Sequence, residues 1–139
     1  PRDKTGQTRS LPRLLHTESK VMVGVALAPD GNSKGQVEEL RSKTKKWAQK
    51  ITRSPLDDDN NRTSLTTTIA KTVVFPLAAT TLTHKEVTSI MAPALTAALP
   101  RANIVRSFPR VVLYGPKSCQ GLGMTDPFLY QKPFLPIKL

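Results

Sequence analysis

Three consecutive aspartates are the residues in this sequence that most resemble a catalytic group. Paired carboxylates can hold two divalent ions for nucleotidyl transfer, so Asp57-Asp58-Asp59 is a candidate metal site. The triplet follows Pro55 and precedes two asparagines, a context typical of a loop and not of the strands that position polymerase carboxylates. We therefore interpret it as a solvated cluster that caps a helix.

Other reactive side chains are few and scattered. Cys119 is the one cysteine, so no internal disulfide can form, which favours a reducing compartment. His16 and His84 lie far from it in the sequence, so a zinc site has few ligands to draw on. Gly121-Leu122-Gly123 is too short for a dinucleotide fingerprint. We predict no catalytic residue, no metal ligand and no cofactor in this segment.

The charge balance points to a polyanionic partner. Lys and Arg total 21 against 10 Asp and Glu, a formal net charge of +11, which favours nucleic acid through steering and counterion release. The 139 residues suit one domain. No run approaches the roughly 18 apolar residues of a membrane span, and no signal peptide is visible. These features predict an intracellular protein, nuclear or cytoplasmic, with no membrane partner.

The first half of the chain predicts a strand followed by an amphipathic helix. Residues 20–28 form a valine-rich apolar run that ends in turn residues, and Ser33 with Gln36 has the spacing of a capping box. A helix over 34–52 is expected next. Its apolar face carries Val37, Leu40, Thr44, Trp47, Ala48 and Ile51, and its opposite face carries Lys43, Lys46, Lys50 and Arg53. Such a basic face either contacts phosphates or is an ordinary solvated surface.

The second half predicts two more helices and a second β segment. Residues 62–82 carry few charges, which predicts a mostly buried helix that Pro76 kinks or ends. Thr83 and Glu86 form a capping box for a third helix, which Pro93 should interrupt and Pro100 should stop. The predicted fold is therefore mostly α: a bundle of about three helices with short β segments near 21–27 and 111–114, and irregular ends.

Several short blocks resemble the region after the catalytic aspartates in reverse transcriptases of non-LTR retrotransposons, as in protist and microalgal copies. The first is Val23-Gly24-Val25 through Asp30-Gly31, followed by a charged helix with Trp47. Others are Leu99-Pro100-Arg101, Phe108-Pro109-Arg110, Tyr114-Gly115-Pro116 and Gln120-Gly121-Leu122-Gly123. Val23 stands where the family usually has Leu, and Gln120 replaces the first glycine of a "GGLG" signature. The blocks occur along the chain in the same order as in the family.

The resemblance implies a fragment of an RNA-directed DNA polymerase. Residues 20–125 would form the last palm strand, the helical thumb and the connection, with 1–19 a disordered or truncated edge and 126–139 an irregular tail. The family's Tyr/Phe-x-Asp-Asp motif, which would bind Mg²⁺ in a palm domain upstream, does not occur here. The implied role is to grip an RNA or DNA template–primer by its phosphates. The candidate contacts are Lys43, Lys46, Lys50, Arg53, Arg101, Arg106 and Arg110.

Two alternatives remain open at this point. The chain can be a small basic nucleic-acid-binding or structural module whose similarity to retroelements is accidental. It can also be a non-functional remnant of a retroelement. Sequence upstream of Pro1 that carries the aspartate motif would favour the fragment hypothesis.

Overall fold

The structure is a computed structural model that describes residues 6, 10, 13 and 15–131, and it is mostly helical, as the sequence predicts. The expectations for 1–14 and 132–139 fall largely outside these described residues. In chain order the elements are β1 (Lys20–Met22), β2 (Val25–Leu27), α1 (Lys34–Arg53), α2 (Asp58–Ser64), the π-helix η1 (Leu65–Ile69), α3 (Ala70–Val74), the 3₁₀ helix η2 (Phe75–Ala78), α4 (His84–Arg101), α5 (Arg110–Tyr114), the 3₁₀ helix η3 (Lys117–Cys119) and α6 (Pro127–Tyr130).

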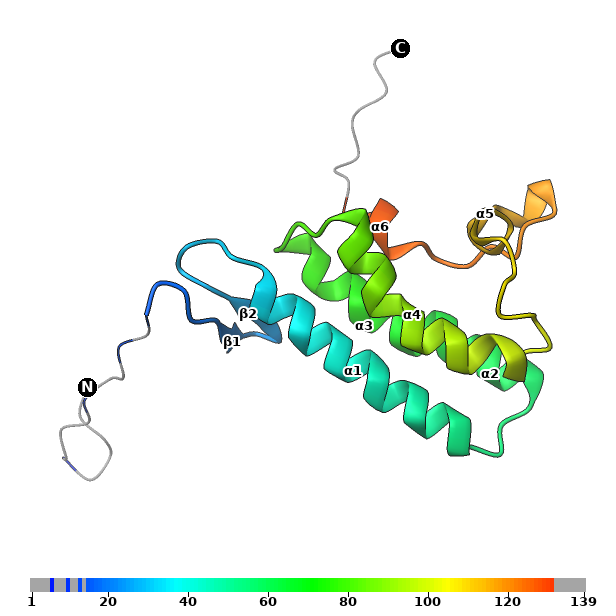
Figure 1. Cartoon of the computed structure of the whole chain (residues 1–139), viewed down its shortest axis with the longest axis horizontal. Helices are drawn as coiled ribbons and strands as arrows, with labels where there is room; N and C mark the ends of the chain where they lie inside the picture. Colours follow the sequence, from blue (N-terminus) through cyan, green and yellow to red (C-terminus); the bar gives the residue numbers. More distant parts are fainter. Residues whose placement is uncertain (1–5, 7–9, 11–12, 14, 132–139) are drawn as a thin grey trace, which may run out of the picture.

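Three helical rods form the body of the molecule (Figure 1): α1, the continuous α2–η1–α3 segment, and α4. Two side-chain bonds show that α1 and α4 run in the same direction. The Arg41 guanidinium donates to Ser89 Oγ over 2.7 Å, and further along Arg101 donates to the Ser54 carbonyl. The middle rod lies between α1 and α4 in chain order and runs in the opposite direction. The bundle therefore runs up, down and up.

The core lies where the three rods meet. The sequence-predicted apolar face of α1 is buried at Val37, Leu40 and Ile51, with Trp47 partly buried against it. From α4, Ile90, Ala94 and Leu99 are fully buried side chains of the same cluster. This confirms the predicted packing face of α1.

The middle rod departs from the prediction that most of 62–82 is buried. Leu65, Ile69 and Val73 are buried, but the threonines between them face solvent or are half-buried. Thr67 and Thr72 instead donate their hydroxyls to carbonyls four residues earlier. That local bond satisfies the hydroxyl without burial. On a regular α-helix, with 3.6 residues per turn, side chains at four-residue spacing rotate gradually around the helix axis. The wider π turn of η1 offsets this rotation and keeps the apolar side chains on one face.

The predicted single strand over 20–28 is wrong, because β1 and β2 form an antiparallel hairpin. Val21 pairs with Ala26, and a two-residue turn joins the strands. Both turn residues have positive φ, 52° at Val23 and 81° at Gly24, as in a type I′ turn. The usual signal for this turn is Asn-Gly or Asp-Gly, so Val-Gly inside an apolar run concealed it.

Helix starts follow the predicted capping chemistry at two of three places. Thr83 and Glu86 form the predicted capping box, and Asp57 caps α2 by accepting a bond from the Asn60 amide. Ser33 makes no side-chain cap bond, which corrects the first prediction. Gln36 does not reach back along its own helix but accepts a hydrogen bond from the Ala26 amide in β2. The hairpin is thereby attached to α1.

Prolines act differently on the two rods that contain them, the middle rod and α4. The middle rod changes to 3₁₀ geometry at Phe75–Ala78 and then ends, as predicted from Pro76. The α4 helix instead continues through Pro93 and reaches Arg101, so the predicted interruption is wrong. Buried neighbours on both sides, Met91 and Ala94, hold the helix in place despite the missing backbone donor.

The predicted β segment near 111–114 is also wrong, because Arg110–Tyr114 forms the short helix α5. The chain then folds back on it: Leu122 donates its backbone N–H to the Val112 carbonyl, and Gly123 donates to the Gly115 carbonyl. A Cβ on Gly121 would lie only 2.1 Å from the Gly115 oxygen, so glycine is required for this close approach. The segment thus presents Tyr114 towards α4.

Candidate nucleic-acid interface

A row of four cationic side chains follows one flank of α1. Lys43, Lys46, Lys50 and Arg53 are spaced by three or four residues, so they align along the helix. The last three of these residues are exposed. We call these four residues the α1 basic row. Its position away from Leu40 and Ile51 leaves the core undisturbed by any ligand that contacts the row.

The members of the row differ in their surroundings. Lys43 Nζ lies 2.8 Å from Glu39 Oε1, an ion pair one turn apart on the helix. Among the residues that the structure describes, Lys46, Lys50 and Arg53 form no ion pair. A partly exposed pair of this kind is worth little and does not prevent Lys43 from exchanging its partner for a phosphate.

An open groove beside the row adds a cation that sequence reasoning missed. The groove is lined by Lys43 from α1 and by Lys71 and Thr68 from the middle rod, and Phe75 and Gly24 also line it. Lys43 and Lys71 are distant in sequence, so no local pattern could have paired them. A second shallow groove along α1 is lined by Arg41 and Lys45 together with Lys46 of the row.

The three predicted arginines beyond α1 do not form one site. Arg101 is at the end of α4, and its bond to the Ser54 carbonyl brings it to the residue that follows Arg53 and α1. Arg106 is exposed in the loop after α4, and Arg110 begins α5. The α5 and α6 helices lie on the other side of α4 from α1 (Figure 1). The structure therefore groups Arg101 with the α1 basic row and sets Arg110 apart.

Chemically, the row and Arg101 provide charge without a base-reading group. Lysine ammonium groups and arginine guanidinium groups donate to phosphate oxygens, and contacts of this kind fix the position of a duplex without reading its sequence. The surface suits the backbone of a nucleic acid.

The aspartate triplet has a structural role. Asp57 caps α2, Asp58 and Asp59 occupy its first turn, and the Asp58 carboxylate accepts a bond from the Asn103 side-chain amide. Acidic residues at this end of a helix interact favourably with its dipole. Within the described part of the chain, no three His, Cys, Asp or Glu side chains come close enough together to hold a metal ion.

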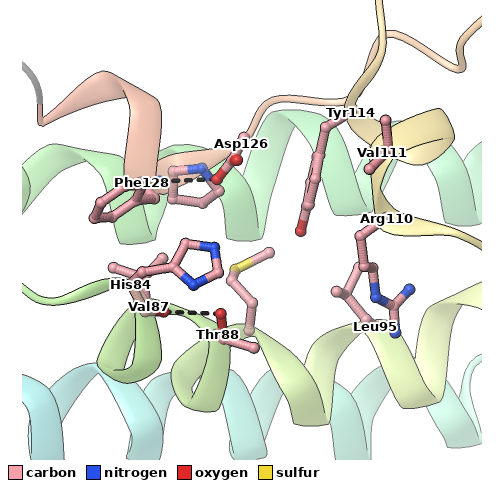
Figure 2. A pocket seen from close by; sticks show the side chains of 11 residues that line it. His84, Val87, Thr88, Leu95, Arg110, Val111, Tyr114, Asp126 and Phe128 are labelled. Atoms are coloured by element: carbon pink, nitrogen blue, oxygen red, sulfur yellow. Dashed lines mark hydrogen bonds between the residues drawn. The ribbon is translucent and has the colours of Figure 1, made fainter.

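A second feature lies on the α5 and α6 side of α4. A cavity of about 370 Å³ opens between these three helices, and its walls are mostly apolar. Figure 2 shows the Tyr114 side chain standing across it from His84, with Arg110 at one end and Asp126 on the α6 side. The His84 and Phe128 rings meet edge to face, 5.0 Å apart at an interplanar angle of 89°.

Burial affects the chemistry of Tyr114. Desolvation raises the pKa of its phenol, and the nearby Asp126 carboxylate raises it further, while Arg110 acts in the opposite direction. The hydroxyl therefore stays protonated at neutral pH and can donate a hydrogen bond into the cavity. Sequence reasoning identified Arg110 alone among these polar groups, because the cavity joins three helices that no local pattern connects.

Comparison with family models, with curated proteins and with solved structures finds no match for this chain. Among the described residues, no helix is both long enough and apolar enough to cross a membrane.

Proposed function

We propose that this chain grips the sugar–phosphate backbone of a template–primer duplex, as a thumb-like fragment of a retroelement reverse transcriptase. The observation that carries the proposal is the α1 basic row. Its four cationic side chains align on the solvent-facing side of a helix whose apolar face is packed in the core. The resemblance of the sequence blocks to the family and the mostly helical fold are consistent with this role. The RNA or DNA partner would be bound by charge and shape.

The grip has a defined surface. The α1 basic row extends along about three turns of helix, and Arg101 adds a cation next to its C-terminal end. Lys71 flanks the row across the groove at Lys43. Phosphates along one strand of a duplex can meet such a linear series, whereas a compact ligand would use only part of it.

Catalysis is assigned to residues outside this chain. The family's aspartates would bind Mg²⁺ in a palm domain upstream, and that palm domain is the proposed protein partner. The purified chain should therefore show no primer extension with Mg²⁺. Extension that Asp58→Ala abolishes would contradict this and would restore the aspartate triplet as a metal site.

The test is the salt dependence of duplex binding. Binding of a short RNA–DNA hybrid and of a DNA duplex should not depend on base sequence. The logarithm of the association constant should fall linearly with the logarithm of the salt concentration, with a slope of about −0.9 per neutralised phosphate on DNA. Changing Lys43, Lys46, Lys50 and Arg53 together to Gln should flatten the slope by roughly 2 to 4 units. Helicity should be retained, because Gln is nearly as good a helix former.

A matched control removes the same charge elsewhere. Arg13, Lys20, Lys34 and Lys85 are exposed residues outside the row, and changing all four to Gln lowers the net charge equally. This variant should keep most of the wild-type slope. Equal flattening in both variants would show that net charge, and not the α1 basic row, drives binding, and would overturn the proposal.

A second candidate is a small basic nucleic-acid-binding module unrelated to retroelements. The observation in its favour is that one continuous cluster, from Val37 to Met124, forms the core without the hairpin. Coding sequence before Pro1 separates the two: a Tyr/Phe-x-Asp-Asp motif there supports the fragment, and its absence supports the module. A non-functional remnant is a further alternative. In that case the folded chain would bind the RNA–DNA hybrid no more tightly than a chain of scrambled sequence with the same net charge.

A further inference from the structure

The cavity between α4, α5 and α6 has walls suited to a flat ring. Tyr114 from α5 forms one side, and His84 from α4 with Phe128 from α6 lies across from it (Figure 2). Val87 and Leu95 contribute apolar surface between them. Aromatic faces on such walls favour a planar π-system by stacking.

Polar groups with free hydrogen-bonding capacity converge on the same space. Among the described residues, neither the Tyr114 hydroxyl nor the His84 imidazole has a side-chain hydrogen-bond partner. The Arg110 guanidinium reaches the Arg106 carbonyl at 3.4 Å, the limit of a hydrogen bond. The Asp126 carboxylate accepts one bond, from the Phe128 amide, and keeps further acceptor capacity.

The charges around the cavity select among flat ligands. Arg110 can donate to a ligand acceptor, and Asp126 can accept from a ligand donor. The Asp126 charge disfavours a phosphate or a carboxylate inside the cavity. An aliphatic side chain of a peptide would bury the Tyr114 hydroxyl without a partner, which is costly. The complementary occupant is neutral and planar, with acceptors and donors on its edge.

We propose that this cavity takes an unpaired purine base, with guanine preferred, at the end of a bound nucleic acid. Guanine carries both acceptors, O6 and N7, and donors, N1–H and the 2-amino group, on its edges. A base reaches the cavity only when it is unpaired, because a duplex hides its ring faces. Exposed Arg106, next to the cavity at Arg110, meets the adjoining phosphate.

This inference rests on the proposed backbone grip and adds a base-specific site on the opposite side of α4. The two surfaces are separate, so each can be disrupted alone. The α1 basic row holds paired sequence by its phosphates, and the cavity holds one unpaired residue.

The experiment compares three forms of one duplex: blunt, with one unpaired terminal guanosine, and with an abasic residue in place of that guanosine. The abasic form keeps the extra sugar and phosphate, so the difference isolates the base. The guanosine form should bind about tenfold more tightly than the abasic form, the effect expected of one stacked base. An unpaired cytidine should gain less.

Two phenylalanine substitutions on α4 form a matched pair. Thr88 is exposed at the rim of the cavity, so Thr88→Phe should fill its mouth and remove the guanosine advantage. Thr96 is exposed on the same helix but does not line the cavity, so Thr96→Phe should leave the advantage intact. Both variants should bind the blunt duplex like the wild type. His84→Ala should lower the advantage without affecting blunt binding.

The outcomes separate the two proposals. A wild-type protein that fails to bind the blunt duplex contradicts the proposed backbone grip. A protein that binds the blunt duplex but treats the guanosine and abasic forms alike contradicts the base site. Free guanosine monophosphate should compete only far above the duplex concentration; competition at equal concentration would identify a free nucleotide as the ligand and overturn the assignment to a nucleic-acid end.

Discussion

The helical bundle and the β-hairpin bury apolar side chains to very different extents. Leu40, Ile90 and Leu99 of the bundle have 0% exposure, whereas Met22 in the hairpin is 59% exposed and Val23 at its tip is 92% exposed. Two strands cannot by themselves enclose a core. The comparison teaches that the bundle carries its own stability. The hairpin buries only Val25 and Ala26 of its apolar residues, and it depends on its attachment to α1, where Gln36 accepts a hydrogen bond from the Ala26 amide.

The largest expected effect is a loss of bundle stability on removing a core side chain. Leu99→Ala deletes buried volume at a fully enclosed site, and should lower the free energy of unfolding by roughly 2 to 5 kcal/mol in urea titrations. Met22→Ala in the hairpin is the control and should change stability by less than about 0.5 kcal/mol, as for exposed residues generally. Equal losses would show that the two regions fold as one unit.

The attachment of the hairpin is the next contrast. Gln36→Ala leaves the buried Ala26 amide without its acceptor, at a cost of about 1–3 kcal/mol. Amide hydrogen exchange over 20–27 should accelerate strongly, with much smaller changes in α4. The control is Gln49→Ala, an exposed residue of the same helix. Unchanged exchange in the hairpin of the Gln36 variant would mean that other contacts hold it.

A smaller effect is expected at the start of α4. Thr83→Ala removes the hydroxyl that accepts a hydrogen bond from the Glu86 backbone amide. Loss of such a cap lowers the free energy of unfolding by about 1 kcal/mol. The thermal midpoint of the bundle should fall by a few degrees, with hairpin exchange unaffected. Thr81→Ala, just outside the cap, should leave the midpoint in place. A fall of the thermal midpoint in both variants would show that the loop before α4, and not the cap at Thr83, stabilises the bundle here.

The smallest effect is a local gain in the hairpin. Val23 has a φ of 52°, a conformation unfavourable for a β-branched residue and accepted by asparagine. Val23→Asn should therefore slow hydrogen exchange in β1 and β2, by an amount corresponding to about 1 kcal/mol. The urea midpoint of the bundle should not move. Faster exchange would show that Val23 contributes contacts that outweigh its backbone strain.

Local patterns in the sequence determined much of the bundle. The apolar spacing from Val37 to Ile51 predicted α1, and the Thr83–Glu86 box predicted the start of α4, because both signals depend on residues within one or two helical turns. The α1 basic row follows from the same periodicity. The Asp57-Asp58-Asp59 cluster was predicted to cap a helix for an equally local reason, and in the structure the Asp57 carboxylate accepts a hydrogen bond from the backbone amide three residues ahead.

Tertiary contacts decided the rest. The Val23-Gly24 turn and the α5 helix contradict local β-propensity, because pairing and packing partners set the conformation of short apolar runs. Gln36 had the sequence pattern of a capping box, yet its side-chain oxygen accepts a hydrogen bond from the Ala26 amide of β2. That strand lies beside Gln36 only in the folded chain. The cavity joins His84, Tyr114 and Asp126 from three helices. Such sites arise from packing between distant segments, whereas helical periodicity is already present in each segment alone.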